Sequence, residues 1–137
     1  MATTTATISL GSSDLADSML SISNFCTLTN AGTDTGVTKT TGLTRIETSA
    51  TSNVVVLDSG ATTRAQTITS GKVFMQNLND RGDGTKYVTV LQGTVEIGRL
   101  YGGDWMFFPW DGGSGNDIEI TPSSTTDTTI EYIAFYE

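Results

Sequence analysis

The chain has 137 residues, a formal net charge of −8 and a sequence pI of about 4.2, with seven Lys and Arg residues in all. This length predicts one domain that can bury a hydrophobic core. The acidic balance argues against a nucleic-acid partner, because no basic patch is available to neutralise phosphates.

The N-terminal half is rich in Thr and Ser, which favour strands and turns over helices. Residues 2–10 alternate weakly, with Ile8 and Leu10 on one side, and predict a first strand or an extended arm. Later patterns predict strands at 19–29, at 37–48 with a break at Gly42, and at 54–57. The weakest patterns are a short helical turn over 13–19 and an alternation over 65–69.

Cys26 is the single cysteine of the chain, so an intramolecular disulfide is excluded. It lies in the strand expected over 19–29, where we expect a small buried hydrophobic residue and no reactive thiol.

From residue 72 the apolar alternation becomes sharper. It predicts strands at 72–78, 86–91, 94–101, 105–110, 117–121 and 128–137. In the third of these, Val95 and Ile97 are expected on the buried side. Nine or ten strands at this spacing predict an all-β, single-domain β-sandwich or jelly-roll-like barrel. We expect residues 1–10 to form the strand or arm and residues 11–137 to form the β domain.

The stretch from Arg99 to Asp111 holds both tryptophans. In the strand 105–110, Trp105 and Phe107 are expected on one side and Met106 and Phe108 on the other. Such a strand is buried between two layers, or between one layer and a partner chain. Pro109 cannot donate a ladder hydrogen bond, which predicts an edge position or a strand end.

Two interpretations of these aromatic residues stay open. They form core, or some of them lie at a contact surface, since aromatic residues are enriched at interface hot spots. Our candidate contact residues here are Tyr101, Trp105 and Trp110, which together with neighbouring aspartates also suit a carbohydrate platform.

The residues do not predict an enzyme, a cofactor or a metal site. Histidine is absent, which removes the usual general base and zinc ligand. Carboxylate pairs that hydrolyse glycosides and a calcium site at Asp111, Asn116 and Asp117 are weaker alternatives. Arg81-Gly82-Asp83 is an integrin-type tripeptide, which turn geometry explains equally well.

We find no membrane-length apolar stretch and no basic and apolar leader at the N-terminus. We therefore expect no membrane contact, no signal peptide and synthesis in a cytoplasm.

The second half, about residues 70–137, resembles small structural proteins of tailed bacteriophages, especially those of cyanobacteria and marine bacteria. The resemblance is carried by the segments 73–78, 86–90, 97–104, 107–110 and 130–137. Their shared pattern is a strand ending in Asn-Leu, a glycine-rich loop, Tyr-Val-x-Val, Gly-x-Leu-x-x-Gly-Asp, Phe-x-Pro and a final Glu-Tyr.

This resemblance implies a virion component, above all a decoration or cement protein on the outside of the capsid. Such proteins are commonly β-rich and often trimeric, and their partner is the major capsid protein. The N-terminal arm, with Ile8 and Leu10, is the expected anchor, because an added strand gains main-chain hydrogen bonds from an exposed sheet edge. A neck, tail or fibre module that binds a receptor or carbohydrate is the alternative.

Overall fold

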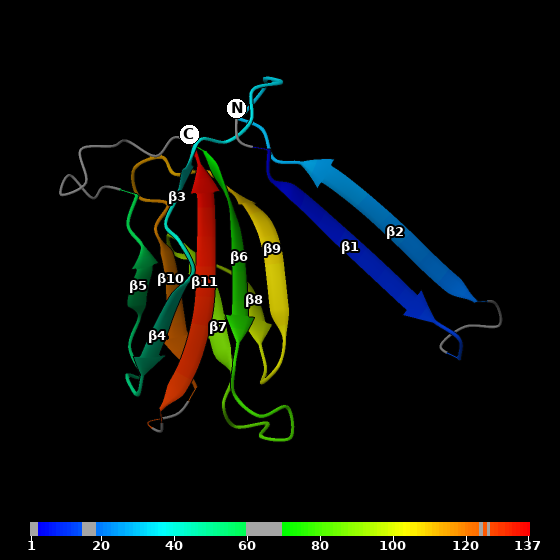
Figure 1. The fold of residues 1–137 in the computed structure, drawn as a ribbon. Coiled ribbons are helices and arrows are strands. Elements are labelled where there is room, and N and C mark those ends of the chain that lie inside the picture. Colours follow the sequence, from blue (N-terminus) through cyan, green and yellow to red (C-terminus); the bar gives the residue numbers. More distant parts are fainter. Residues whose placement is uncertain (1–2, 15–18, 60–69, 124, 126) are drawn as a thin grey trace. The chain divides into compact units, whose positions relative to one another are not determined.

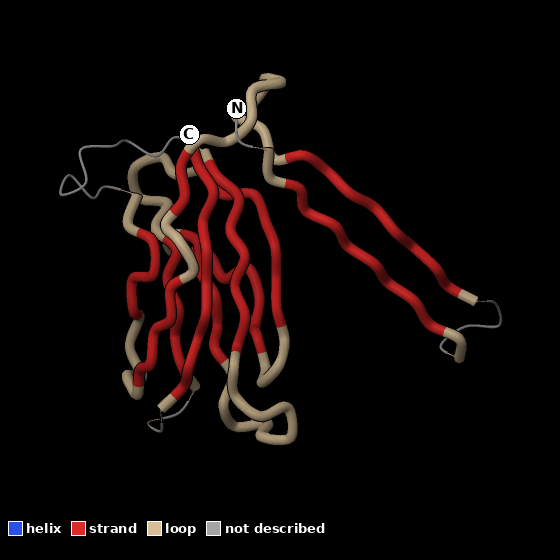
Figure 2. Tube along the Cα trace, viewed as in Figure 1, coloured by secondary structure: helices blue, strands red, loops and turns tan. Residues whose placement is uncertain are grey.

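The computed structural model describes residues 3–14, 19–59, 70–123, 125 and 127–137. These residues form strands joined by loops, with no helix among them (Figures 1 and 2). The all-β expectation is therefore confirmed. The strands are β1 (Thr5–Ser12), β2 (Leu20–Thr27), β3 (Lys39–Thr40), β4 (Thr44–Thr48), β5 (Val54–Leu57), β6 (Gly71–Asn77), β7 (Val88–Gln92), β8 (Val95–Leu100), β9 (Trp105–Trp110), β10 (Ile118–Pro122) and β11 (Thr128–Tyr136).

Most strands lie where the alternation predicted them, within a few residues at each end. The break expected at Gly42 separates β3 from β4, and the backbone there has a φ of 71°, which glycine adopts without strain. The helical turn expected over 13–19 includes residues outside the described part, and the alternation expected over 65–69 lies wholly outside it.

The chain divides into two compact units, Met1–Thr38 and Lys39–Glu137. The first unit contains an antiparallel hairpin in which β1 and β2 pair along their full length, from Thr5 with Thr27 to Ser12 with Leu20. The boundary expected after residue 10 lies inside β1. β1, the first strand of this hairpin, lies where we expected a strand or an arm over residues 1–10.

The second unit is a β-sandwich of two antiparallel sheets. One sheet has the order β5-β10-β7-β8, and the other has the order β3-β11-β6-β9, with β4 also paired to β11. Both orders have ends, so in the part of the chain that the structure describes neither sheet closes into a barrel. Among the described residues β9 pairs only with β6 and ends its sheet, which confirms the edge position predicted from Pro109.

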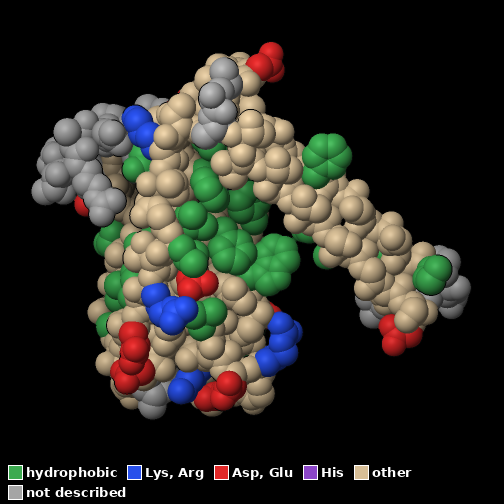
Figure 3. All heavy atoms as spheres, in the orientation of Figure 1, with side chains coloured by type: hydrophobic (Ala, Val, Ile, Leu, Met, Phe, Trp, Pro, Cys, Tyr) green, Lys and Arg blue, Asp and Glu red, His purple; other side chains and the backbone are tan. Residues whose placement is uncertain are grey.

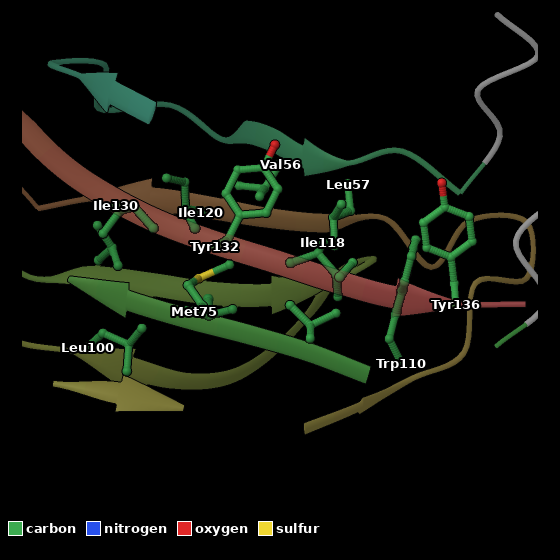
Figure 4. Packing of buried hydrophobic residues seen from close by; sticks show 14 residues of the cluster. Val56, Leu57, Met75, Leu100, Trp110, Ile118, Ile120, Ile130, Tyr132 and Tyr136 are labelled. Atoms are coloured by element: carbon green, nitrogen blue, oxygen red, sulfur yellow. The ribbon is translucent and has the colours of Figure 1, made fainter. Parts of the chain in front are cut away.

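One core lies between the two sheets of the sandwich, and Figure 4 shows Met75 and Tyr132 from one sheet pointing toward Ile118 and Ile120 from the other. β11 alternates strictly, so every second side chain from Thr128 to Tyr136 is buried. β6 alternates in the same way, as its sequence predicted. The buried cluster consists of Val56, Leu57, Val73, Met75, Val88, Val90, Leu100, Trp110, Ile118, Ile120, Ile130, Tyr132, Ala134 and Tyr136.

The expectation for β8 was wrong. Val95 and Ile97 are exposed, whereas Leu100 is buried opposite Val88. The pairing of β7 with β8 shifts register between Val90 and Leu91, which leaves Ile97 without a partner across the ladder. Such a bulge changes which side chains face the core, so the local alternation did not predict the buried side.

Candidate interaction surfaces

The hairpin of the first unit has one apolar face. Directly paired residues of an antiparallel ladder point to the same side. The register of β1 with β2 therefore gathers six apolar side chains on one face, together with Asn24 opposite Ile8 and Ser12 opposite Leu20. The apolar side chains are those of Ala6, Ile8, Leu10, Leu20, Ile22 and Cys26. Four of these residues are exposed by 41–47% of their surface, namely Ile8, Leu10, Leu20 and Ile22. We call this set the hairpin face.

The opposite side of the hairpin is polar apart from Phe25. It carries Thr7, Ser9, Ser21 and Ser23. These short hydroxyl side chains favour extended backbone but bring little apolar area of their own. The two-sided contrast makes the hairpin amphipathic, and of its apolar residues the site prediction contained only Ile8 and Leu10. Their partners on β2 could be placed only with the pairing register in hand.

Cys26 is exposed on the hairpin face, opposite Ala6. This corrects the expectation of a buried residue. The reason is that the apolar side of β2 has no second layer within the two-stranded sheet to which it belongs.

The two tryptophans of β9 have opposite environments. Trp110 is 2% exposed, lies in the sandwich core and donates its indole N–H to the Asn116 carbonyl oxygen at 2.7 Å. Trp105 is 48% exposed on the other side of the strand. The expectation that Trp110 forms a contact surface is therefore replaced by a core role, while Trp105 remains a surface candidate.

Trp105 belongs to a larger apolar area on the outer side of β11, β6 and β9. Across these strands Phe74 pairs with both Ile133 and Phe107. The ring centroid of Trp105 lies 6.2 Å from that of Phe74. Phe135 and Pro109 flank this row on either side of Lys72. We call these residues the outer aromatic face, and Figure 3 shows hydrophobic side chains gathered over these strands.

Tyr101, the third aromatic candidate, is 43% exposed at the end of β8. Its ring lies 5.1 Å from that of Tyr87, and the Arg99 guanidinium lies over the Tyr87 ring at 5.2 Å. Arg99 also contacts the Glu96 carboxylate at 3.3 Å, and this negative charge raises the pKa of Arg99 above its ordinary value. The cluster brings together the exposed ring of Tyr101, the half-buried ring of Tyr87 tilted against it and one cation, which suits a polar ligand with a flat apolar side.

The acidic loop residues have structural roles. The Asp117 carboxylate accepts hydrogen bonds from the backbone N–H and the hydroxyl of Ser59, at 2.8 and 2.6 Å. Asp111 accepts the backbone N–H of Gly113 at 3.0 Å. Among the described residues, no three or more His, Cys, Asp and Glu side chains are grouped to hold a metal ion.

The Arg81-Gly82-Asp83 tripeptide also has contacts that stabilise a turn. Arg81 donates to the Gly103 carbonyl oxygen at 2.9 Å. Asp83 accepts from the hydroxyl and the backbone N–H of Thr85, and these hydrogen bonds lower the pKa of the Asp83 carboxyl. Asp83 is therefore engaged within its own loop, and Arg81 bridges to the loop between β8 and β9.

Comparison of the chain with protein-family models and with curated proteins gave no match. In the described part of the chain, no helix has the length and apolar character needed to span a membrane.

Proposed function

We propose that this chain is a bacteriophage capsid decoration protein. It binds the outer surface of the head, contacts the major capsid protein and stabilises the capsid lattice as a homo-oligomer, in the first instance a trimer. It is made in the host cytoplasm and acts on the virion. The proposal starts from the resemblance of residues 70–137 to structural proteins of tailed phages.

One structural observation favours this proposal above the others. The β1–β2 hairpin is a sheet of its own, and each of its strands pairs with one neighbour only among the described residues. A hairpin of this kind presents main-chain donors and acceptors along both outer edges. A capsid subunit with an exposed sheet edge can extend its sheet with such a strand, which gives affinity through main-chain hydrogen bonds.

The lattice amplifies a contact that is weak in a single copy. A capsid repeats the same binding site many times, and an oligomer that engages several sites at once binds far more tightly than one arm does. A decoration protein also needs a stable body, which the sandwich with its single core supplies. It does not need a catalytic group.

The first experiment is quantitative mass spectrometry of purified particles of the source phage, scaled to the major capsid protein. We expect a copy number comparable with that of the capsid subunit. A few copies per particle would contradict a head decoration role and favour the neck or tail. Absence from the particle would overturn the virion assignment altogether.

A neck, tail or fibre module that binds carbohydrate is the second candidate, and the cluster of Tyr87, Tyr101 and Arg99 favours it. Exposed aromatic rings beside polar groups suit the apolar faces of sugars. In this case the particle holds few copies, and glycans shift the fluorescence of the exposed Trp105.

A further inference from the structure

Each of the two units has an apolar sheet face on which, among the described residues, no other sheet of the same unit packs. One is the hairpin face, which includes Leu10 paired with Ile22. The other is the outer aromatic face, where Phe74 lies between Ile133 and Phe107. We infer that the hairpin face of one copy of this chain packs on the outer aromatic face of a second copy.

The two faces match in size. β1 and β2 have eight residues each and β6 has seven, so the two surfaces are about 26 and 23 Å long at ~3.3 Å per residue. Two hairpin strands cover about 10 Å of width, and the three receiving strands span about 14 Å. Sheets stack face to face at about 10 Å, which is the spacing that aromatic and branched side chains fill.

The hairpin face is uncharged, and the receiving side carries Lys72 and Glu131, of which Glu131 forms an ion pair with Arg45 at 2.9 Å. Residues 1–38 contain no Lys or Arg, so no cation of this unit repels Lys72, the charged residue between Phe135 and Pro109. Like charges across a contact would be costly.

The connection between the units favours a second copy as the occupant. Val37 still belongs to the first unit, because its backbone N–H donates to the Leu28 carbonyl oxygen at 3.1 Å. Lys39 already belongs to β3 and pairs with Tyr136. Thr38 alone lies between them. Short hinges of this kind favour exchange of an element between identical chains over folding back within one chain.

Exchange of the hairpin between copies also favours one form of oligomer, a closed ring. One hairpin footprint is smaller than the roughly 800 Å² that each partner buries in a stable interface. Each copy has one hairpin to give and one aromatic face to receive, so a closed ring uses two contacts per copy. A closed ring is therefore the stable form. This inference concerns self-association in solution and does not depend on what the assembled protein binds.

Cys26 provides a probe in the unaltered protein, because it is the single thiol and lies on the hairpin face. We expect its reaction with N-ethylmaleimide to slow roughly tenfold once the protein concentration exceeds the dissociation constant about tenfold. In F74E/F107E, which alters only the receiving face, we expect fast reaction at every concentration. Protection that does not depend on concentration would show packing within one chain and overturn the inference.

Matched variants test the same contact by light scattering after size exclusion. L10E/I22E places two charges on the hairpin face, and S9E/S23E places the same charges at the adjacent cross-strand pair on the polar face. We expect the first variant to be monomeric and the second to associate like the unaltered chain. Equal behaviour of the two variants would contradict the inference.

Mixing the two face variants, L10E/I22E and F74E/F107E, tests whether the hairpin face of one copy binds the outer aromatic face of another. L10E/I22E keeps an intact receiving face, and F74E/F107E keeps an intact hairpin. Each should be monomeric alone. Because one contact is weaker than a closed ring, an equimolar mixture should form a one-to-one complex only at a higher protein concentration than the unaltered chain needs to associate. Near-ultraviolet circular dichroism checks that each variant retains the sandwich. Two folded variants that do not combine would overturn the inference.

Discussion

Asn77 is the residue whose side chain ties the two sheets of the sandwich together. It is fully buried at the end of β6, and its Nδ2 donates to the carbonyl oxygens of Lys86 and Leu100, at 2.9 and 3.0 Å. Its Oδ1 accepts from the backbone N–H and the side chain of Asn79. The amide thus uses its donors and acceptor within the loops that lead from one sheet to the other.

Replacing Asn77 by Leu keeps the number of side-chain heavy atoms but leaves the carbonyl oxygens of Lys86 and Leu100 without this donor. We expect the free energy of unfolding to fall by about 3 kcal/mol, since each buried group that loses its partner costs 1–3 kcal/mol. Chemical denaturation of the full chain measures the change. Q76A, at the neighbouring residue on the outer side of β6, is the control and should change stability by less than about 0.5 kcal/mol. Equal effects would contradict the role given to the amide.

At the scale of elements, the connection from β8 to β9 crosses from one sheet to the other and packs tightly on the connection from β6 to β7. Gly102 lies at this crossing. A Cβ added there would overlap the backbone carbonyl of Asp80 and come within 2.8 Å of the Asn79 carbonyl oxygen. Backbone atoms cannot rotate away as side chains do, so the two loops would have to separate.

We therefore expect G102A to lower the free energy of unfolding by about 2–3 kcal/mol, as overpacking of a tight site does. Gly82 is the matched control, because a Cβ there meets nothing within 4 Å. G82A should be neutral or slightly stabilising. Thermal unfolding of both variants gives the comparison, and a neutral G102A would show that the loops can move apart at little cost.

At the scale of the whole molecule, the large buried cluster belongs to one unit, and Leu28 and Val37 of the first unit are buried apart from it. Every residue of the buried cluster lies between Val56 and Tyr136, within the unit Lys39–Glu137. The hairpin of the first unit is a two-stranded sheet, and such a hairpin alone is at best marginally stable in water.

We expect a fragment of residues 39–137 to fold by itself. Its near-ultraviolet circular dichroism should keep the signal of the buried Trp110, and its unfolding should be cooperative. A fragment of residues 1–38 should show little strand content by far-ultraviolet circular dichroism. An unfolded 39–137 fragment would mean that the sandwich needs the first unit to fold.

Only part of the candidate contact surfaces could be predicted from the sequence. Ile8, Leu10, Tyr101 and Trp105 were identified from the sequence and are exposed. Leu20, Ile22, Phe74 and Phe107 were not, because each becomes part of a surface only through its partners on another strand. Trp110 could not be told from Trp105 by type, and only the placement of β9 on β6 assigned one to the core and the other to the surface.

The sequence by itself determined the all-β class and the positions of most strands, because period-two alternation is a local property that β6 and β11 display clearly. Only the tertiary structure decided the order of the strands in the two sheets, the bulge that exposes Val95 and Ile97, and the pairing that gives the hairpin its apolar face. The strand order depends on contacts between residues far apart in the chain, whereas the bulge and the apolar face depend on the register between two consecutive strands. The alternation within a single strand encodes neither.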